Sequence, residues 1–287
     1  MNDYIIITDS SCDLPESVVE EFGIEVIKLD FIIEGEEAQN NDAMDARSFY
    51  RVLRTGKMIT TSAVSIDRFL GAIEPSLEAG KDVLYLGFSS GLSGTFNAGA
   101  VAVGELSEKY PDRKVYAVDT LAASMGQGLL VWLAANMKKD GKSIEEVRDY
   151  AQNNKMNLAH WFTVNDLFFL KRGGRVSAAT AILGTALQIK PVMHVDDAGK
   201  LIKVSTARGR KASIDALFAK IKETATDVSG QTVFISHGDC IEDAEYLAEK
   251  IKTELGVKEV MISYVGPVIG AHSGPGTLAL FFMATNR

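Results

Sequence analysis

The stretch DVLYLGFSSGLSGT, which covers residues Asp82–Thr95, decides the fold class. Its first half, Asp82–Phe88, is a short and almost continuously apolar run, which is typical of a strand buried on both faces of a parallel sheet. The helical pattern of Thr95–Lys109 begins directly after the loop that follows. A strand that passes through a loop of small residues into a helix is the unit of α/β folds, so this stretch predicts a parallel sheet.

The same alternation of strands and helices continues on both sides of this stretch. Further strands are expected at Tyr4–Thr8, Glu25–Leu29 and Lys114–Val118, and helices at 46–55, 66–79, 123–139 and 143–155. Asp13-Leu14-Pro15-Glu16 has a capping-box pattern with an early proline and predicts the start of another helix. The run Phe31–Gly35 predicts a hairpin. In such a sheet, ligands bind at the carboxyl ends of the strands.

The second half of the chain has a different pattern. Strands are expected at 160–164, Pro191–Asp196, Leu201–Ala207, Thr232–Ser236, Glu259–Val265 and Leu278–Ala284, and helices at 165–171, 177–189 and 241–255. Hairpins mixed with helices predict an α+β domain. We therefore expect an N-terminal α/β domain with a parallel sheet at residues 1–160, a C-terminal α+β domain at 161–287, and a ligand between them.

Composition argues against several classes of function. The 287 residues carry a net charge of −8, whereas a protein that binds nucleic acid needs a basic face. The two cysteines, Cys12 and Cys240, form no CxxC motif and favour a reducing, cytoplasmic compartment. No histidine or cysteine lies at ligand spacing from another, so we expect no metal site. The longest strongly apolar run, Leu278–Ala284, is too short to cross a bilayer, and we expect neither a signal peptide nor a membrane anchor.

Three segments contain residues suited to binding an anion. Ser89–Thr95 places glycines and hydroxyls at the start of a helix, where backbone N–H groups attract negative charge, although the same residues also suit helix capping. Thr60–Ser65 is a second hydroxyl cluster, with the same alternative. Gly266–Gly276 holds four glycines and two prolines around His272 and predicts a tight loop that brings the backbone close to a ligand.

The first of these segments also supports a different function. Gly87-Phe88-Ser89-Ser90-Gly91 matches the GxSxG pattern of serine hydrolases, with Ser89 as the nucleophile and His272 as a candidate base. The pentapeptide is short, and no pattern identifies the acidic member of a triad. A serine hydrolase therefore stays an alternative, as does an oligomeric structural or signalling module without a ligand.

Two basic segments stand out in this acidic chain. Leu170–Ser177 contains Arg172 and Arg175 around two glycines, and Arg208–Lys211 contains a second group of cations. Either segment could neutralise an acid or form a docking surface. Both also suit ordinary solvated helix ends.

Taken in order, these motifs resemble the DegV family of bacterial fatty-acid-binding proteins. The resemblance runs along almost the whole chain and rests on six segments: Thr8–Pro15, Thr61–Ser65, Ser89–Thr95, Leu170–Arg175, Ile189–Pro191 and Gly266–Gly276. Ala63-Val64 departs from the family, which commonly has Gln-Pro after Thr-Ser. The flanking hydroxyls are retained, so we expect a change in the shape of the loop and not the loss of the site.

The resemblance implies two α/β domains with one fatty acid buried between them, no catalytic residue and no cofactor besides this ligand. Its carboxylate-binding groups correspond to Thr61, Ser62, Ser93 and Gly94, and its supporting polar network to His272, Arg172 and Gly270. In the group with an assigned role, the protein presents its fatty acid to a separate fatty acid kinase, which makes an acyl phosphate for phospholipid metabolism. Arg208 and Arg210 then correspond to a surface that faces the kinase.

Physical chemistry adds two requirements for such a site. Burial of each methylene contributes roughly 0.8 kcal/mol, so a long chain needs a deep apolar tunnel. Candidates for its lining are Phe162, Phe168, Phe169, Ile182, Leu183 and Leu187, each of which also suits an ordinary core. A buried carboxylate needs hydrogen-bond donors, and hydroxyls meet this need without the permanence of an Arg–carboxylate clamp, which suits a cargo that must be handed on.

Overall fold

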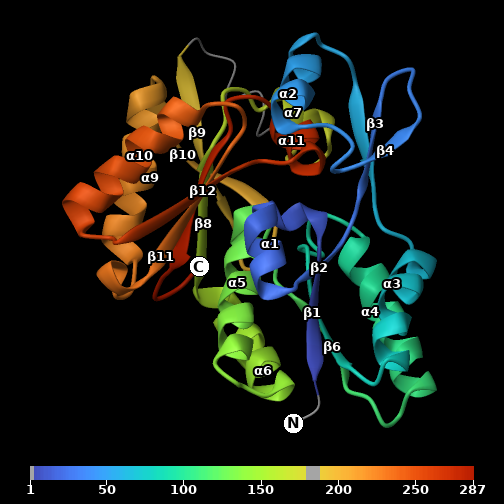
Figure 1. Ribbon diagram of the computed structural model, residues 1–287. Coiled ribbons are helices and arrows are strands. Elements are labelled where there is room, and N and C mark those ends of the chain that lie inside the picture. Colours follow the sequence, from blue (N-terminus) through green and yellow to red (C-terminus); the bar gives the residue numbers. More distant parts are fainter. Residues whose placement is uncertain (1–2, 179–187) are drawn as a thin grey trace.

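Within residues 3–178 and 188–287, which the computed structural model describes, the strands form three sheets (Figure 1). The first sheet is parallel and has the order β2-β1-β6-β7. Its strands are β1 (Tyr4–Asp9), β2 (Glu25–Ile27), β6 (Asp82–Gly87) and β7 (Val115–Asp119). Every residue of β6 is buried, as its apolar run predicts. The predicted parallel sheet is confirmed.

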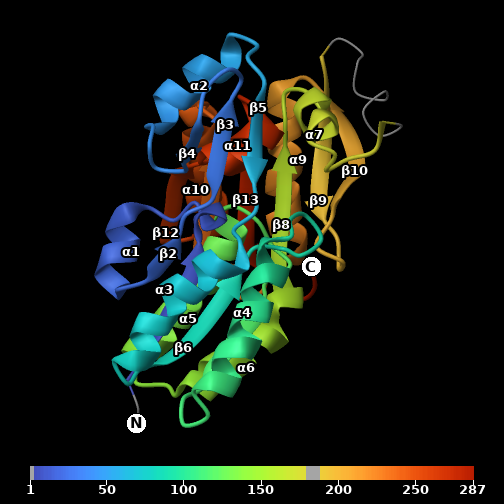
Figure 2. The same cartoon turned by 90° about the vertical axis from the view of Figure 1, so that its right-hand side faces the viewer.

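Helices cover both faces of the parallel sheet (Figure 2). The helices of this half are α1 (Glu16–Phe22), α2 (Ala46–Arg54), α3 (Ile66–Glu78), α4 (Thr95–Lys109), α5 (Met125–Lys139) and α6 (Ile144–Asn154). α3 and α4 pack on one face around Val83 and Tyr85, and α5 and α6 pack on the other around Leu84 and Leu86. This alternation along β6 is the two-residue repeat of a strand.

The second large sheet is mixed, with the order β10-β9-β8-β13-β11-β12. Its strands are β8 (Leu158–Thr163), β9 (Ile189–Val195), β10 (Leu201–Arg208), β11 (Thr232–His237), β12 (Glu259–Tyr264) and β13 (Leu278–Met283). α9 (Arg210–Thr224) and α10 (Ile241–Leu255) cover its outer face. Our sequence analysis did not predict α9 as a helix, although Ile214, Leu217, Phe218 and Ile221 have helical spacing.

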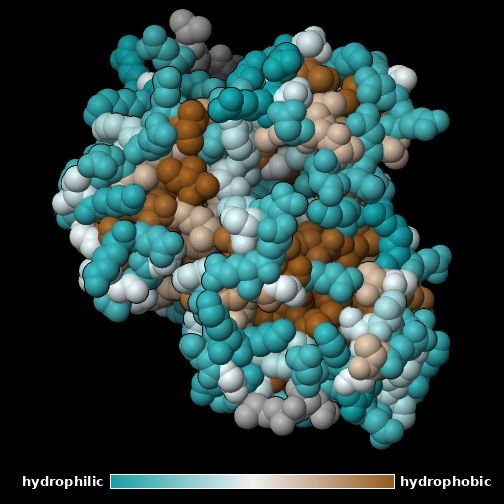
Figure 3. Space-filling model, in the orientation of Figure 1, coloured by the Kyte–Doolittle hydropathy of each residue, from teal (hydrophilic) through white to brown (hydrophobic). Residues whose placement is uncertain are grey.

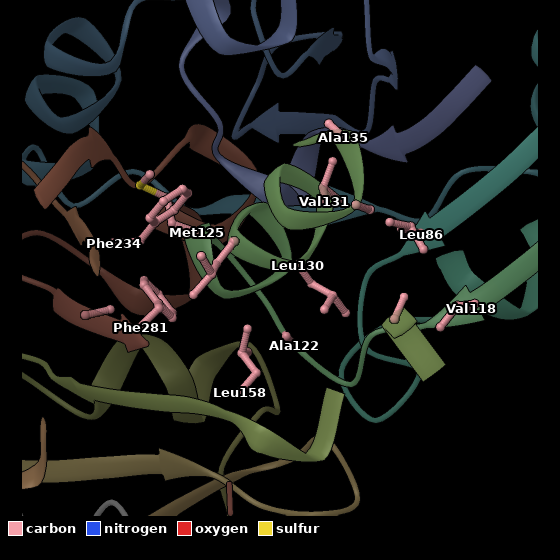
Figure 4. Close-up of a cluster of buried hydrophobic side chains, with 14 of the residues drawn as sticks. Leu86, Val118, Ala122, Met125, Leu130, Val131, Ala135, Leu158, Phe234 and Phe281 are labelled. Atoms are coloured by element: carbon pink, nitrogen blue, oxygen red, sulfur yellow. The ribbon is translucent and has the colours of Figure 1, made fainter. Parts of the chain in front are cut away.

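Helix α5 lies between the two large sheets and joins them into one core (Figure 4). Leu86 and Val118 from the parallel sheet lie on one side of the helix, and Phe234 and Phe281 from the mixed sheet lie on the other. Nine residues of α5 are buried, which fits a helix that is apolar on nearly all sides. The inner face of the mixed sheet is therefore turned toward the N-terminal half of the chain.

The third sheet is small and antiparallel, with β3 (Asp30–Ile33) between β4 (Ala38–Asn40) and β5 (Ile59–Ser62). The predicted hairpin around Gly35 is confirmed, whereas β5 was not predicted as a strand. This sheet packs with α2 against α7 (Phe168–Arg172) and α11 (Pro267–Ser273) from the second half of the chain.

The prediction of a loop at 266–276 is wrong, because its first part forms helix α11. Pro267 lies in the first turn, where its missing N–H costs nothing and its fixed φ suits a helix. Gly270 allows close packing, since a Cβ there would lie 2.7 Å from the hydroxyl oxygen of Tyr50. The glycines thus let a short helix pack tightly against α2.

The capping box predicted at Asp13 is also wrong. α1 begins where expected, but Pro15 is its N-cap and no side chain caps it. The Asp13 carboxylate instead accepts hydrogen bonds from the backbone N–H of Gly266 (3.0 Å) and the hydroxyl of Ser124 (2.6 Å). It therefore ties the first strand–helix connection to α5 and α11.

Other predictions concern the edges of these elements. The helix predicted at 177–189 lies mostly outside the described residues, and its last residue begins β9. Short 3-10 helices occur at Ser10–Cys12, Lys155–Asn157 and Val228–Gly230. The domain limits 1–160 and 161–287 stay a prediction.

The described residues offer no group of three or more His, Cys, Asp or Glu side chains that could hold a metal ion. None of the described helices is both long enough and apolar enough to cross a membrane. The face in Figure 3 is largely hydrophilic at its periphery, with apolar side chains visible toward its centre.

Candidate functional site

A cavity of about 270 Å³ lies between the inner face of the mixed sheet and the N-terminal half of the chain. Most of its wall is apolar and comes from elements far apart in the sequence. These side chains include Phe88, Phe162, Leu170, Val268, Ile269 and Ala279. A cavity lined in this way suits a hydrocarbon chain, because burial of apolar surface is the dominant favourable term in binding it.

Three hydroxyl groups, one glycine and one imidazole lie at one part of the wall. We call this part the hydroxyl rim: Thr61, Ser62, Ser93, Gly94 and His272. Ser62 and Gly94 are exposed, and the other three residues are half-buried, so the rim lies where the cavity meets solvent. Thr61 and Ser62 end β5, and Ser93 and Gly94 precede α4. The structure thus brings these residues together at one cavity.

Hydrogen bonds hold the rim together. Thr61 Oγ1 lies 2.7 Å from His272 Nε2, which links β5 to α11. Ser93 Oγ lies 3.0 Å from Thr95 Oγ1, and Thr95 Oγ1 accepts from the backbone N–H of Val64 at 3.4 Å. The segments around Thr61 and Ser93, which are far apart in sequence, are therefore joined directly.

Two arginines give this end of the cavity a positive charge. Burial and, to a smaller extent, the charges of Arg175 and Arg172 together lower the pKa of His272 to about 4. The imidazole is therefore neutral at pH 7. Arg175 lines the cavity, and its guanidinium donates to the backbone oxygens of Leu92 (3.3 Å) and Gly173.

Arg172 was predicted to belong to this network, whereas Arg175 was not. Arg172 lines a neighbouring hollow of about 230 Å³, together with Thr61 and His272, and its guanidinium lies 4.9 Å from the centroid of the Phe169 ring. Both arginines belong to the motif Leu170–Arg175, so the signal was present. The motif alone did not show which cation faces the cavity.

Gly173 keeps the imidazole in place by having no side chain. A Cβ on this residue would lie only 2.2 Å from Nδ1 of His272. The backbone of Gly173 has an ordinary helical conformation, so steric contact and not backbone geometry requires glycine here.

A second polar group lies deeper in the wall, and we call it the serine cluster: Ser124, Ser236 and Ser273. Each of these side chains is buried. Ser124 Oγ lies 2.9 Å from Ser236 Oγ and donates to Asp13. Burial and the charge of Asp9, acting against the lowering effect of its hydrogen bonds, raise the pKa of Asp13 to about 7. Ser273 lies within the motif Gly266–Gly276, whereas Ser124 and Ser236 come from two other segments for which the sequence carried no motif.

The predicted acyl tunnel agrees with the cavity only in part. Phe162 lines the cavity. Phe168 is 54% exposed, and Phe169 packs in the cluster around Phe49, so neither ring belongs to the cavity wall. Ile182, Leu183 and Leu187 lie outside the described residues. His160 also lines the cavity, a position that the sequence did not predict.

Ser89 has a structural environment and not that of a nucleophile. It is fully buried, its hydroxyl donates to the backbone oxygen of Gly199 (2.8 Å), and it accepts from the N–H of Gly91 (3.2 Å). His272, the candidate base, contacts Thr61 instead. This geometry favours a loop-fixing role for Ser89 over the nucleophilic one.

The predicted docking residues differ in their exposure. Arg208, at the end of β10, is exposed. Arg210 is half-buried and donates through Nε to Asp243 at 2.8 Å. Of the two, Arg208 is therefore the side chain available to a partner.

Comparisons with known proteins agree with this architecture. A family model described as "Uncharacterised protein, DegV family" matches residues 4–285. A DegV domain-containing protein of Clostridium perfringens is 46% identical over 289 aligned residues, which cover 100% of this chain and 99% of the relative.

Two solved structures have closely similar folds. A DegV lipid-binding protein of Thermotoga maritima is 30% identical, with a TM-score of 0.87 and coverage of 99% of both chains. A DegV family protein of Thermus thermophilus, described with fatty acid binding, is 29% identical, with a TM-score of 0.87 and coverage of 99% of this chain and 100% of the other. The two sheets and their helices therefore form the same α/β architecture as in these proteins.

Proposed function

The chain belongs to the DegV family, and from that premise we propose that it binds one long-chain fatty acid in the cavity between its two large sheets. The carboxylate lies at the hydroxyl rim, and the hydrocarbon chain extends inward along the apolar wall. The observation that carries this proposal is one cavity with apolar walls and a polar rim at its opening. The names of the Thermotoga and Thermus structures support the same class of ligand.

The energetics of the cavity fit this ligand. An enclosed long acyl chain gains on the order of 10 kcal/mol from burial of its methylenes. The carboxylate loses water on binding and needs donors in exchange. Thr61 and Ser93 supply hydroxyls, and Gly94 supplies a backbone N–H beside α4.

Arg175 contributes charge without forming a clamp. Its guanidinium already donates to the carbonyl oxygens of Leu92 and Gly173, so it stabilises an anion mainly through its positive field. The hydroxyls then make the direct contacts. This arrangement holds the carboxylate while leaving it near solvent, where another protein can reach it.

Denaturing mass spectrometry of the purified protein tests the ligand. We expect one fatty acid per chain, either co-purified or taken up from stearic acid after delipidation. A chain that is empty and takes up no stearic acid would favour a structural module instead. Labelling of Ser89 by a fluorophosphonate, abolished in Ser89→Ala, would favour a hydrolase.

We further propose that the bound fatty acid is presented to a separate kinase. A carboxylate oxygen attacks the γ-phosphorus of ATP, the bond to ADP breaks, and an acyl phosphate forms. The half-exposed rim supports such access. Arg208 offers an exposed cation at the end of β10 for docking, whereas Arg210 is occupied by Asp243.

Reversal of one charge tests the docking role. With a bacterial fatty acid kinase, ATP and stearic acid, Arg208→Glu is expected to slow acyl phosphate formation, trapped as the hydroxamate, while stearic acid still binds. Lys258→Glu makes the same charge change at an exposed site before β12 and is the control. Loss of stearic acid binding in Arg208→Glu, or equal rates in both variants, would contradict the docking role.

A further inference from the structure

The serine cluster holds a hydrogen-bonding group that has no partner among the described residues. The hydroxyl of Ser273 is buried, lines the cavity and makes no hydrogen bond there. Its side chain is only 6% exposed. A buried hydroxyl without a partner is destabilising, so such a group in a ligand cavity indicates a bond that a ligand completes.

The hydrogen bonds of the neighbouring serines determine what that ligand must offer. Ser124 uses its single proton toward Asp13 at 2.6 Å. When Asp13 is ionised, the proton in the 2.9 Å contact between Ser124 and Ser236 therefore comes from Ser236. The oxygen of Ser236 keeps its lone pairs free as acceptors, while Ser273 keeps its proton free as a donor. A hydroxyl group on the ligand matches both serines, because it can donate to the oxygen of Ser236 and accept from the hydroxyl of Ser273.

Strand register and one side-chain hydrogen bond relate Ser236 and Ser273 to the same part of the cavity. Ser236 lies opposite Ala279, which in turn lies opposite Phe162, and all three line the cavity. Thr277 precedes Ala279 by two residues and donates through Oγ1 to the backbone oxygen of Ser273 at 3.0 Å. Thr277 thus connects the end of α11 to the strand that borders Ser236.

The backbone of Ser124 supports a role for its hydroxyl. Its φ of 53° and ψ of −146° lie in a region that glycine adopts far more easily than serine. A glycine would relieve the strain but would break the chain of hydrogen bonds from Asp13 to Ser236. The structure therefore retains a side chain at a position where the backbone disfavours one.

The surroundings of the cluster do not favour an anionic guest. Asp9 is buried and Asp13 is half-buried on this side, and no described cation contacts Asp13. A carboxylate would find no counter-charge there, whereas a neutral hydroxyl needs none. The cluster is therefore unsuited to the head of a fatty acid and suited to a neutral polar group on its chain.

We propose that the serine cluster is a second subsite, which binds a hydroxyl group carried on the acyl chain, and that the protein prefers hydroxylated long-chain fatty acids to plain ones. This inference rests on the proposed function, because it assigns the carboxylate to the hydroxyl rim. The hydroxyl rim then binds the carboxylate of the ligand, and the serine cluster binds the hydroxyl on its chain.

Calorimetric titration of the delipidated protein tests this subsite. Stearic acid is compared with 3-, 10- and 12-hydroxystearic acid, since the position of the hydroxyl reports the distance between the subsites. We expect at least one isomer to bind about tenfold more tightly than stearic acid, the effect of two neutral hydrogen bonds. In Ser236→Ala and in Ser273→Ala this preference falls to near one.

Ser273→Ala is the variant least expected to disturb folding, because its hydroxyl makes no bond in the described structure. Ser93→Ala is the contrasting variant, and it weakens plain and hydroxylated acids by the same factor. The subsite is overturned if no isomer binds more tightly than stearic acid, or if the serine variants leave the preference intact. Failure of every acid, stearic acid included, to bind the wild type would instead contradict the proposed function and the subsite with it.

Discussion

The hydroxyl rim and the serine cluster are built from the same residue types but differ in the charge that surrounds them. At the rim, burial and then the charges of Arg175 and Arg172 lower the pKa of His272. At the cluster, burial and the charge of Asp9 raise the pKa of Asp13. A fatty acid carboxylate therefore finds a counter-charge at the rim and none at the cluster. Charge behind the hydroxyls, and not the hydroxyls themselves, determines the direction in which the ligand lies.

Removal of both hydroxyls at the rim is expected to have the largest effect. Hydrogen bonds to a charged group contribute about 1.5–3 kcal/mol each, so Thr61→Ala combined with Ser93→Ala should weaken stearic acid binding by about a hundredfold or more. Thr253→Ala, on the exposed side of α10, is the control for a harmless threonine substitution. Unchanged binding in the double variant, measured by calorimetry, would show that the carboxylate lies elsewhere.

Loss of the positive charge at the rim should have the next largest effect. Arg175→Gln is expected to weaken stearic acid binding by roughly tenfold, because a cation near the carboxylate contributes on the order of 1 kcal/mol in a half-exposed site. The exposed Arg51→Gln on α2 removes the same charge far from the described cavity wall. If Arg175→Gln and Arg51→Gln bind stearic acid equally well, the proposed difference in charge between the hydroxyl rim and the serine cluster is wrong.

Displacement of the imidazole should have a smaller effect. In Gly173→Ala the new Cβ would push His272 away from Thr61, and we expect stearic acid binding to weaken several-fold while the hydroxyls remain. Gly104→Ala in α4, where a Cβ would have open space, is the matched control and should stabilise the fold by about 0.5–1 kcal/mol. A Gly173→Ala variant with unaltered affinity would mean that His272 does not position Thr61.

The smallest expected effect is on the pH dependence of stability. The folded-state pKa of His272 is about 4, below the ordinary value of 6.5, so the stability it contributes is present above pH 6.5 and declines as the pH falls toward 4. Between pH 6.5 and 5, His272→Gln should reduce the loss of unfolding free energy by on the order of 1 kcal/mol, as measured by urea denaturation. An unchanged slope would contradict the buried position of His272 beside two cations.

Sequence reasoning predicted the rim better than the cluster for a physical reason. Thr61, Ser93 and His272 stand in dense local runs of hydroxyls or glycines, which are visible in one dimension. Ser124 and Ser236 are single residues outside such runs, and only the tertiary fold brings them to the same cavity as Ser273. The strand β6 was predictable because a buried parallel strand is apolar throughout.

Helix α11 is an element that local sequence rules predicted wrongly. Four glycines and two prolines in Gly266–Gly276 indicated a loop. Packing against Tyr50 and Phe49 instead stabilises a short helix, and Gly270 provides the space for it. The choice of Arg175 over Arg172 was likewise beyond the sequence, since it depends on how α7 packs beside the cavity.

A crystal structure of the delipidated protein reloaded with stearic acid tests the central claim most directly. We predict electron density for one ligand in the cavity, with its carboxylate within hydrogen-bond distance of Thr61 and Ser93 and its hydrocarbon chain passing Phe162 and the serine cluster. A carboxylate bound at Ser124 and Ser236, or a ligand outside the cavity, would contradict the account.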